Sequence, residues 1–219
     1  MVANNSTHDI DSLFETFRFK SSNSLETSDD SIHVFIDNSN ILAGFRAYSA
    51  YYNRRRNVKR SQNQGKRSKP KLNYDALFRI LEDGRNTARK VLVASSPLYQ
   101  PLTQAEQAGY EISVLKRIKQ KEQCVDEILH LKILESLLDY HVPSTLVLAS
   151  GDGKGAKYFQ GGFRKCVIMA LERGWQVEVI SWKRQLSQNF TNAEFLKQWK
   201  NFYQVIYLDK FAAELRCDI

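Results

Sequence analysis

Three aspartates stand at positions where their carboxylates could share a metal ion. Asp37 ends the apolar run of residues 32–37, "IHVFID", and Asp152 follows the apolar run of residues 144–150 in "SGDGKG". Asp126 lies near the start of the helical pattern of residues 125–140. Mg²⁺ and Mn²⁺ take carboxylate oxygens as ligands, and such ions can activate water and neutralise charge on a phosphodiester. The residue types therefore predict a Mg²⁺ or Mn²⁺ site held by Asp37, Asp126 and Asp152.

Each of these acids also has a simpler explanation. Asp37, Asn38 or Ser39 can cap the helix that follows, because a short polar side chain accepts a hydrogen bond from an otherwise unpaired amide. Asp126 suits the first turn of a helix, where the dipole favours negative charge. Taken alone, a cap is the better explanation for Asp37. Helix caps need not converge on one edge of a sheet, however, so the combination of the three favours a metal site.

The pattern around these residues predicts how they are positioned. Strands are expected at residues 32–37, 89–95, 111–115, 144–150, 175–181 and 203–209, several of them continuously apolar, as in a sheet covered on both faces. Helices are expected at residues 39–52, 73–84, 101–110, 125–140 and 163–174. This alternation predicts an α/β protein with three layers, α/β/α, around a mainly parallel sheet. The carboxyl ends of its strands would bring Asp37 and Asp152 to the same edge.

The net charge of +8 is concentrated in one stretch. Residues 54–71 contain nine Lys or Arg and no acid, which leaves a net charge of −1 on the rest of the chain. This stretch interrupts the alternation of strands and helices, so we expect an exposed loop insert that contacts the phosphates of a nucleic acid. The basic residues expected to do so are Arg54, Arg55, Arg56, Lys59, Arg60, Lys66 and Arg67. An alternative is that the stretch serves only as a nuclear import signal.

Three further residues are candidates for contact with a nucleic acid. Lys154 follows Asp152 closely and can meet the phosphate backbone. Tyr99 and Trp182 both follow predicted strands, where an aromatic ring can stack on a splayed base. Packing in the core is an equally good explanation for Trp182.

The remaining organisation follows from composition. We expect a disordered acidic and polar tail over residues 1–31 and a single domain over residues 32–217. Within the tail, apolar side chains at helical spacing between residues 10 and 19 suit docking to a protein partner, or folding back on the domain. No apolar run approaches the roughly 18 residues of a membrane span, and no targeting pattern is present, so a cytoplasmic or nuclear protein is expected. The three cysteines show no zinc spacing. The oligomeric state is left open.

Four motifs, in order, resemble the NYN family of PIN-like ribonucleases: "VFIDNSNI", "VDEILHL", "LVLASGDG" and "GWQVEVISW". The resemblance covers roughly residues 32–209 and implies a metal-dependent endoribonuclease acting on single-stranded RNA. It also implies catalytic roles for Asp37, Asn40, Asp126 and Asp152, with Asn40 orienting a metal-bound water or a phosphate oxygen. Family members often carry another acid two residues after the last aspartate, a position that is Lys154 here. The alternative is therefore a catalytically inactive RNA-binding or adaptor module.

The basic stretch generates one prediction. Replacing residues 54–71 with a neutral linker should weaken binding to all single-stranded RNAs to a similar degree. If about five of the cations engage RNA, the slope of log affinity against log salt should flatten by about 3.5, at roughly 0.7 per phosphate contact. The check is a fluorescence binding titration across a salt series. An unchanged slope would leave the stretch as a localisation signal.

Overall fold

The fold was analysed in a computed structural model, which describes residues 30–55, 70–119, 122, 124–153 and 161–217. Its centre is a six-stranded sheet in the order β4-β3-β1-β5-β6-β7, with every neighbouring pair parallel. The strands are β1 Ile32–Asp37, β3 Thr87–Ser96, β4 Glu111–Lys116, β5 Thr145–Ala149, β6 Gln176–Ser181 and β7 Tyr203–Tyr207. The α/β class and the parallel sheet predicted from sequence are confirmed.

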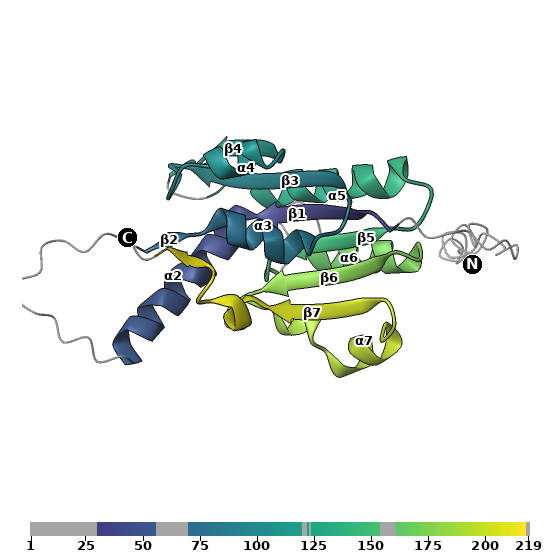
Figure 1. The fold of residues 1–219 in the computed structure, drawn as a ribbon. Helices are drawn as coiled ribbons and strands as arrows, with labels where there is room; N and C mark the ends of the chain where they lie inside the picture. Colours follow the sequence, from purple (N-terminus) through teal and green to yellow (C-terminus); the bar gives the residue numbers. More distant parts are fainter. Residues whose placement is uncertain (1–29, 56–69, 120–121, 123, 154–160, 218–219) are drawn as a thin grey trace, which may run out of the picture.

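Helices cover both faces of this sheet (Figure 1). They are α2 Asn38–Arg55, α3 Tyr74–Glu82, α4 Thr103–Gln107, α5 Val125–Asp139, α6 Gly162–Glu172 and α7 Ala193–Gln198. Successive strand residues point to opposite faces. In β1, Val34 and Ile36 pack with α2, α3 and α4, whereas Phe35 packs with α5, α6 and α7. Each face of the sheet therefore has its own buried core, which gives the three predicted layers.

The strand order places a crevice beside β1. From β1 the chain builds outward through β3 and β4, then returns to β5 on the other side of β1 and builds outward through β6 and β7. The direction of winding reverses between β1 and β5, and open α/β sheets bind ligands outside the carboxyl ends of the strands at such a point. Ile36 pairs with Ala149 at the end of these two strands. Asp37 and the loop after Ala149 consequently lie side by side at the switch point.

The structure contains several short elements that the sequence did not predict. A second, two-stranded sheet pairs β2, Lys71–Leu72, with β8, Arg216–Cys217, in antiparallel register. Short 3₁₀ segments at Gln188–Phe190 and Leu208–Phe211 were also not anticipated, nor was α7. These pieces are too short to show a hydrophobic period, and only tertiary contacts define them. No helix in the described part of the chain is long and apolar enough to cross a membrane.

The structure corrects three boundaries. Helix α2 continues through Arg54 and Arg55, so the predicted loop insert does not begin at residue 54, and its last residue, Lys71, belongs to β2. Ser31, assigned to the tail, is already buried at 3% exposure beside Ser144. Arg56, Lys59, Arg60, Lys66, Arg67 and Lys154 lie outside the described residues, as does the proposed docking segment 10–19.

Trp182 is a core residue, which makes its predicted stacking on RNA wrong. Its side chain is 2% exposed, and the indole Nε1 donates a hydrogen bond to the carbonyl oxygen of Ile41 at 3.0 Å. The ring packs on α2 at Gly44, where a Cβ atom would lie only 2.2 Å from Trp182 Cδ1. The absence of a side chain at Gly44 leaves this space for the indole. Helix α2 can therefore lie close to the end of β6 and over the carboxyl edge of the sheet.

This packing predicts the effect of Gly44→Ala. An exposed Gly-to-Ala change in a helix is stabilising by about 1 kcal/mol. Here the added methyl meets the rigid part of a buried ring, so the domain should instead lose about 1 to 3 kcal/mol of stability. Chemical denaturation checks the sign. In a Trp182→Ala background the same change should become neutral or stabilising, and a destabilisation of equal size in that background would contradict the clash.

Candidate active site

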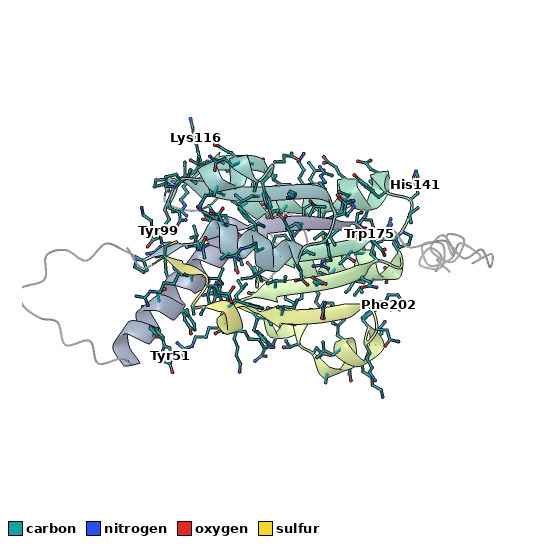
Figure 2. The ribbon with its side chains drawn as sticks, viewed as in Figure 1. Tyr51, Tyr99, Lys116, His141, Trp175 and Phe202 are labelled. Atoms are coloured by element: carbon teal, nitrogen blue, oxygen red, sulfur yellow. The ribbon has the colours of Figure 1, made fainter. Side chains whose placement is uncertain are left out.

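The carboxyl edge of the sheet is hollowed by a cavity of about 820 Å³. Figure 2 labels Tyr99 at this edge and His141 and Trp175 at the opposite one. The lining includes all three predicted aspartates, Asp37, Asp126 and Asp152, together with Asn40 and Tyr99. These residues come from β1, α2, α5 and the loops that follow β3 and β5. The fold therefore brings the predicted acids from separate parts of the chain to one cavity.

Asp37 is the most buried acid of the site, with 4% of its surface exposed. Its Oδ1 accepts a hydrogen bond from the Asn40 backbone N–H at 3.0 Å, and its Oδ2 accepts one from the Ser150 hydroxyl at 3.0 Å. Burial, reinforced by the negative charge of Asp126, raises the pKa of Asp37 to about 7, although both hydrogen bonds oppose this rise. A cation beside the carboxylate would relieve that cost.

The hydrogen bond from the Asn40 backbone N–H to Asp37 is the capping geometry that the sequence suggested as the simpler role of Asp37. Asp37 thus accepts a backbone N–H three residues ahead, as a capping side chain does. Each carboxylate oxygen has two lone pairs, so one hydrogen bond per oxygen leaves further acceptor capacity. Capping and metal binding are therefore compatible roles for Asp37.

Asn40 holds the loop that carries Asp152. Its side-chain oxygen accepts a hydrogen bond from the Gly151 N–H at 2.9 Å, and the Asp152 N–H in turn bonds the Ser150 hydroxyl at 3.2 Å. A Cβ at Gly151 would lie 2.4 Å from the Gln185 carbonyl oxygen, so the loop has no room for a side chain there. The role expected for Asn40 in orienting a water stays a prediction, because the contact that the structure shows is to the backbone.

Asp126 lies in the first turn of α5 and contributes its charge to the cavity. Burial, together with the nearby negative charges of Asp152, Glu127 and Glu122, raises the pKa of Asp126 to about 6. Asp37 ends β1 and Asp152 lies in the loop after the neighbouring β5, and Asp126 interacts electrostatically with both. The carboxylates thus repel one another across one cavity.

Glu122 and Arg117 were not identified from the sequence. Both line the cavity, where Arg117 Nη2 donates to Glu122 Oε1 at 2.6 Å and the Ser95 hydroxyl donates to the same oxygen. Burial alone would raise the pKa of Glu122, but the bonds from Ser95, Ser39 and Arg117 outweigh it and hold that pKa below its usual value. The available signal was that Glu122 is the first acid after the basic run "KRIKQK".

A divalent cation fits the chemistry of this donor set. Among the described residues, no three His, Cys, Asp or Glu side chains converge closely enough to hold a metal by themselves. Mg²⁺, however, is usually held by one or two carboxylates together with substrate phosphates and water. Asp37, Asp126 and Asp152 supply hard oxygen donors whose mutual repulsion a cation would reduce. Such a site would be completed by the phosphate of a bound nucleic acid.

The raised pKa of Asp37 predicts a pH-dependent effect of Asp37→Asn on stability. The folded-state pKa of about 7 exceeds the ordinary 3.8, so folding favours the protonated form and ionisation destabilises the fold as pH rises toward 7. The stability gained by Asp37→Asn in EDTA should therefore grow by about 2 to 3 kcal/mol between pH 5 and pH 8. Denaturation at the two pH values measures it, with Asp139→Asn at an exposed position on α5 as control. A gain equal at both pH values would contradict the assignment.

Comparison with known proteins places this geometry in a family. A search of curated proteins gives no significant match. The fold is similar to the crystal structure of a protein of unknown function from Vibrio parahaemolyticus, with 16% identity and a TM-score of 0.48 over 84% of this chain and 96% of that chain. The NYN domain profile matches residues 31–205, which include the strands and helices that carry Asp37, Asp126 and Asp152. NYN domains are PIN-like nuclease domains. The chain belongs to the NYN domain family.

Proposed function

We propose that this protein is a metal-dependent endoribonuclease that hydrolyses phosphodiester bonds of single-stranded RNA. NYN domains suggest a nuclease or RNA-binding function, and the family usually acts as ribonucleases that use divalent metal ions. The observation that supports the proposal most strongly is that carboxylates from three separate segments line one cavity at the switch point of the sheet. Neither a stable fold nor helix capping requires Asp126 and Asp152 to line the same cavity as Asp37.

Asp37, Asp126 and Asp152 would hold Mg²⁺ or Mn²⁺ in this site. When bound, such an ion lowers the pKa of a coordinated water and neutralises charge that develops on the phosphate. The chain supplies the orientation of the acids. Ser150 is the centre of this arrangement, because its hydroxyl donates to Asp37 while accepting the Asp152 N–H. Asn40 fixes the intervening Gly151, so the positions of Asp37 and Asp152 are coupled through two short hydrogen-bond paths.

The cavity suits a single strand better than a duplex. Beside the acids it is lined by apolar and aromatic side chains, Leu42, Pro97, Leu98 and Tyr99. Leu98 is exposed, and Tyr99 is half-buried. Unpaired bases can pack against exposed apolar side chains such as Leu98, whereas bases in a duplex are stacked inside the helix. This lining supports single-stranded RNA as the substrate class.

An inactive RNA-binding module is the second candidate function. It is favoured by Lys154, which stands where family members often carry another acid and which lies outside the described residues. A module of this kind would keep the cavity and its RNA contacts but would not need a bound metal. The two functions differ in one measurable property, which is whether RNA is cut.

The cleavage prediction concerns Asp37→Asn and Asp152→Asn. Both substitutions keep the shape of the side chain while removing one negative charge, so folding should survive. Cleavage of a labelled single-stranded RNA in Mn²⁺ or Mg²⁺ should fall by about a hundredfold or more in each variant, the size expected when one preorganised electrostatic contact is lost. EDTA should abolish cleavage by the unsubstituted protein.

The control for this experiment is Asp139→Asn, a change of the same chemistry on the exposed surface of α5. It should cleave at the rate of the unsubstituted protein. Full activity in either cavity variant would refute the metal site. RNA binding without cleavage in any metal, by a protein with an intact fold, would instead establish the inactive module.

A further inference from the structure

Helix α2 forms one wall of the cavity over more than two turns. Apart from Asn40 in the first turn, its lining residues recur at intervals of three and four, which places them on one helix face, and they are Asn38, Ser39, Leu42, Ala43 and Arg46. Arg46 lies eight residues beyond Asn38, about 12 Å along the helix axis at 1.5 Å per residue. Figure 1 shows α2 running from the carboxyl edge to a point well beyond the sheet. The cavity therefore extends from the acids toward a cation.

Arg46 is held in place by Tyr99. The guanidinium carbon of Arg46 lies 5.1 Å from the centroid of the Tyr99 ring, a cation–π contact. Tyr99 packs against the hydrophobic core, and its hydroxyl donates a hydrogen bond to the Pro70 carbonyl oxygen at 3.1 Å. A guanidinium stacked on a ring keeps its N–H edge available for a bidentate contact to phosphate. The ring that sequence singled out for stacking thus serves as the support for an arginine.

Lys71 is fixed beside this pair by backbone contacts. Its neighbour Leu72 donates its N–H to Gln100 Oε1 at 3.0 Å, and the Leu72 carbonyl accepts from Gln100 Nε2 at 2.8 Å. Gln100 directly follows Tyr99, so the loop after β3 is joined to β2 by two hydrogen bonds and to Pro70, the residue before β2, by a third. These contacts hold Lys71 at the cavity, which it lines together with Arg46.

The cations of the cavity differ in their partners. Arg117 is paired with Glu122 at 2.6 Å. In contrast, no carboxylate of the described residues lies within ion-pair distance of Arg46 or Lys71, and both are exposed. Two cations without a carboxylate partner, in a cavity whose other charged groups are the acids and the Arg117–Glu122 pair, would bind an anion well.

We propose that Arg46, supported by Tyr99 and assisted by Lys71, forms a second phosphate-binding subsite for the RNA strand whose cleaved phosphodiester lies at the acids. This inference rests on the proposed function and deepens it. The distance along the axis of α2 from its first residue, beside the acids, to Arg46 exceeds the roughly 3.4 Å rise of one nucleotide in a stacked strand. The subsite therefore holds a phosphate a few nucleotides from the cleaved one. The subsite selects substrates long enough to reach it, and it acts through strand position rather than base identity.

The test measures binding of the full chain to an unstructured, fluorescein-labelled RNA of about a dozen nucleotides, within the span of single-strand sites. Anisotropy titrations are done in EDTA over a salt series, so that binding is observed without cleavage. Arg46→Met should weaken binding about tenfold and reduce the salt slope by about 0.7, the values for losing one charge-assisted phosphate contact. Arg46→Lys should keep the slope but lose part of the affinity, because an ammonium lacks the planar fork.

Two controls separate a subsite from a general loss of charge or of folding. Arg184 stacks on Tyr51 in the same manner, at 4.5 Å, but does not line the cavity, so Arg184→Met should leave affinity and slope unchanged. Tyr99→Leu should weaken binding with the slope retained, and adding it to Arg46→Met should cause little further loss, because the ring acts through the guanidinium. Circular dichroism and melting temperatures verify the fold of each variant.

Each outcome bears on one of the two proposals. Unchanged binding by folded Arg46→Met, or an equal loss in Arg184→Met, overturns the subsite and leaves metal-dependent cleavage as the function. The expected pattern in a protein that never cuts RNA retains the subsite and refutes the endoribonuclease. Absence of any RNA binding by the unsubstituted protein overturns both.

Discussion

The site is organised around the buried carboxylate of Asp37 at the end of the central strand. A negative charge in this position is costly, and two donors compensate it: the backbone N–H of Asn40 on one oxygen and the hydroxyl of Ser150 on the other. Ser150 can reach Asp37 only because β1 and β5 are parallel neighbours that end together, with Ile36 opposite Ala149. The same serine accepts the N–H of Asp152, so the stabilisation of one acid places the next. Strand pairing and site geometry are therefore linked by a single residue.

Helix α2 joins this acidic end to the rest of the cavity. It starts at the residue after Asp37, and its side-chain oxygen at Asn40 holds Gly151. About one turn of helix later, Gly44 allows close contact with Trp182. These contacts leave the helix little freedom to tilt, because both its first turn and its middle are in contact with the ends of other strands. Side chains farther along the helix, including Arg46, consequently have a defined position relative to the acids.

Charge is distributed unevenly around the cavity, and the distribution suits a polyanion that must approach an acidic centre. Asp37, Asp126 and Asp152 interact unfavourably across the switch point, as the raised pKa values of Asp37 and Asp126 show. On the wall formed by β3 and the segment after β4, Glu122 is compensated by Arg117 and Ser95. Arg46 and Lys71 provide positive charge at a distance from the acids. A phosphate backbone can be attracted at one end while a cation is accommodated at the other.

The amino-acid sequence by itself determined the α/β class, the six central strands and the three aspartates of the cavity. Continuous apolar runs and Gly-terminated helical periods are local properties, and parallel strands place their carboxyl ends at one edge whatever their order. Tertiary structure alone decided which strands are neighbours, and hence that Ser150 contacts Asp37.

Tertiary structure also decided where the aromatic side chains pack. Trp182 and Tyr99 both follow strands, but the Trp182 ring fills the space beside Gly44, whereas the Tyr99 ring contacts Arg46. Glu122, Arg117 and Lys71 have no periodic signal, because their positions depend on contacts between segments distant in the chain. Local pattern thus specified the elements and their terminal acids, whereas long-range packing specified the partners of each side chain.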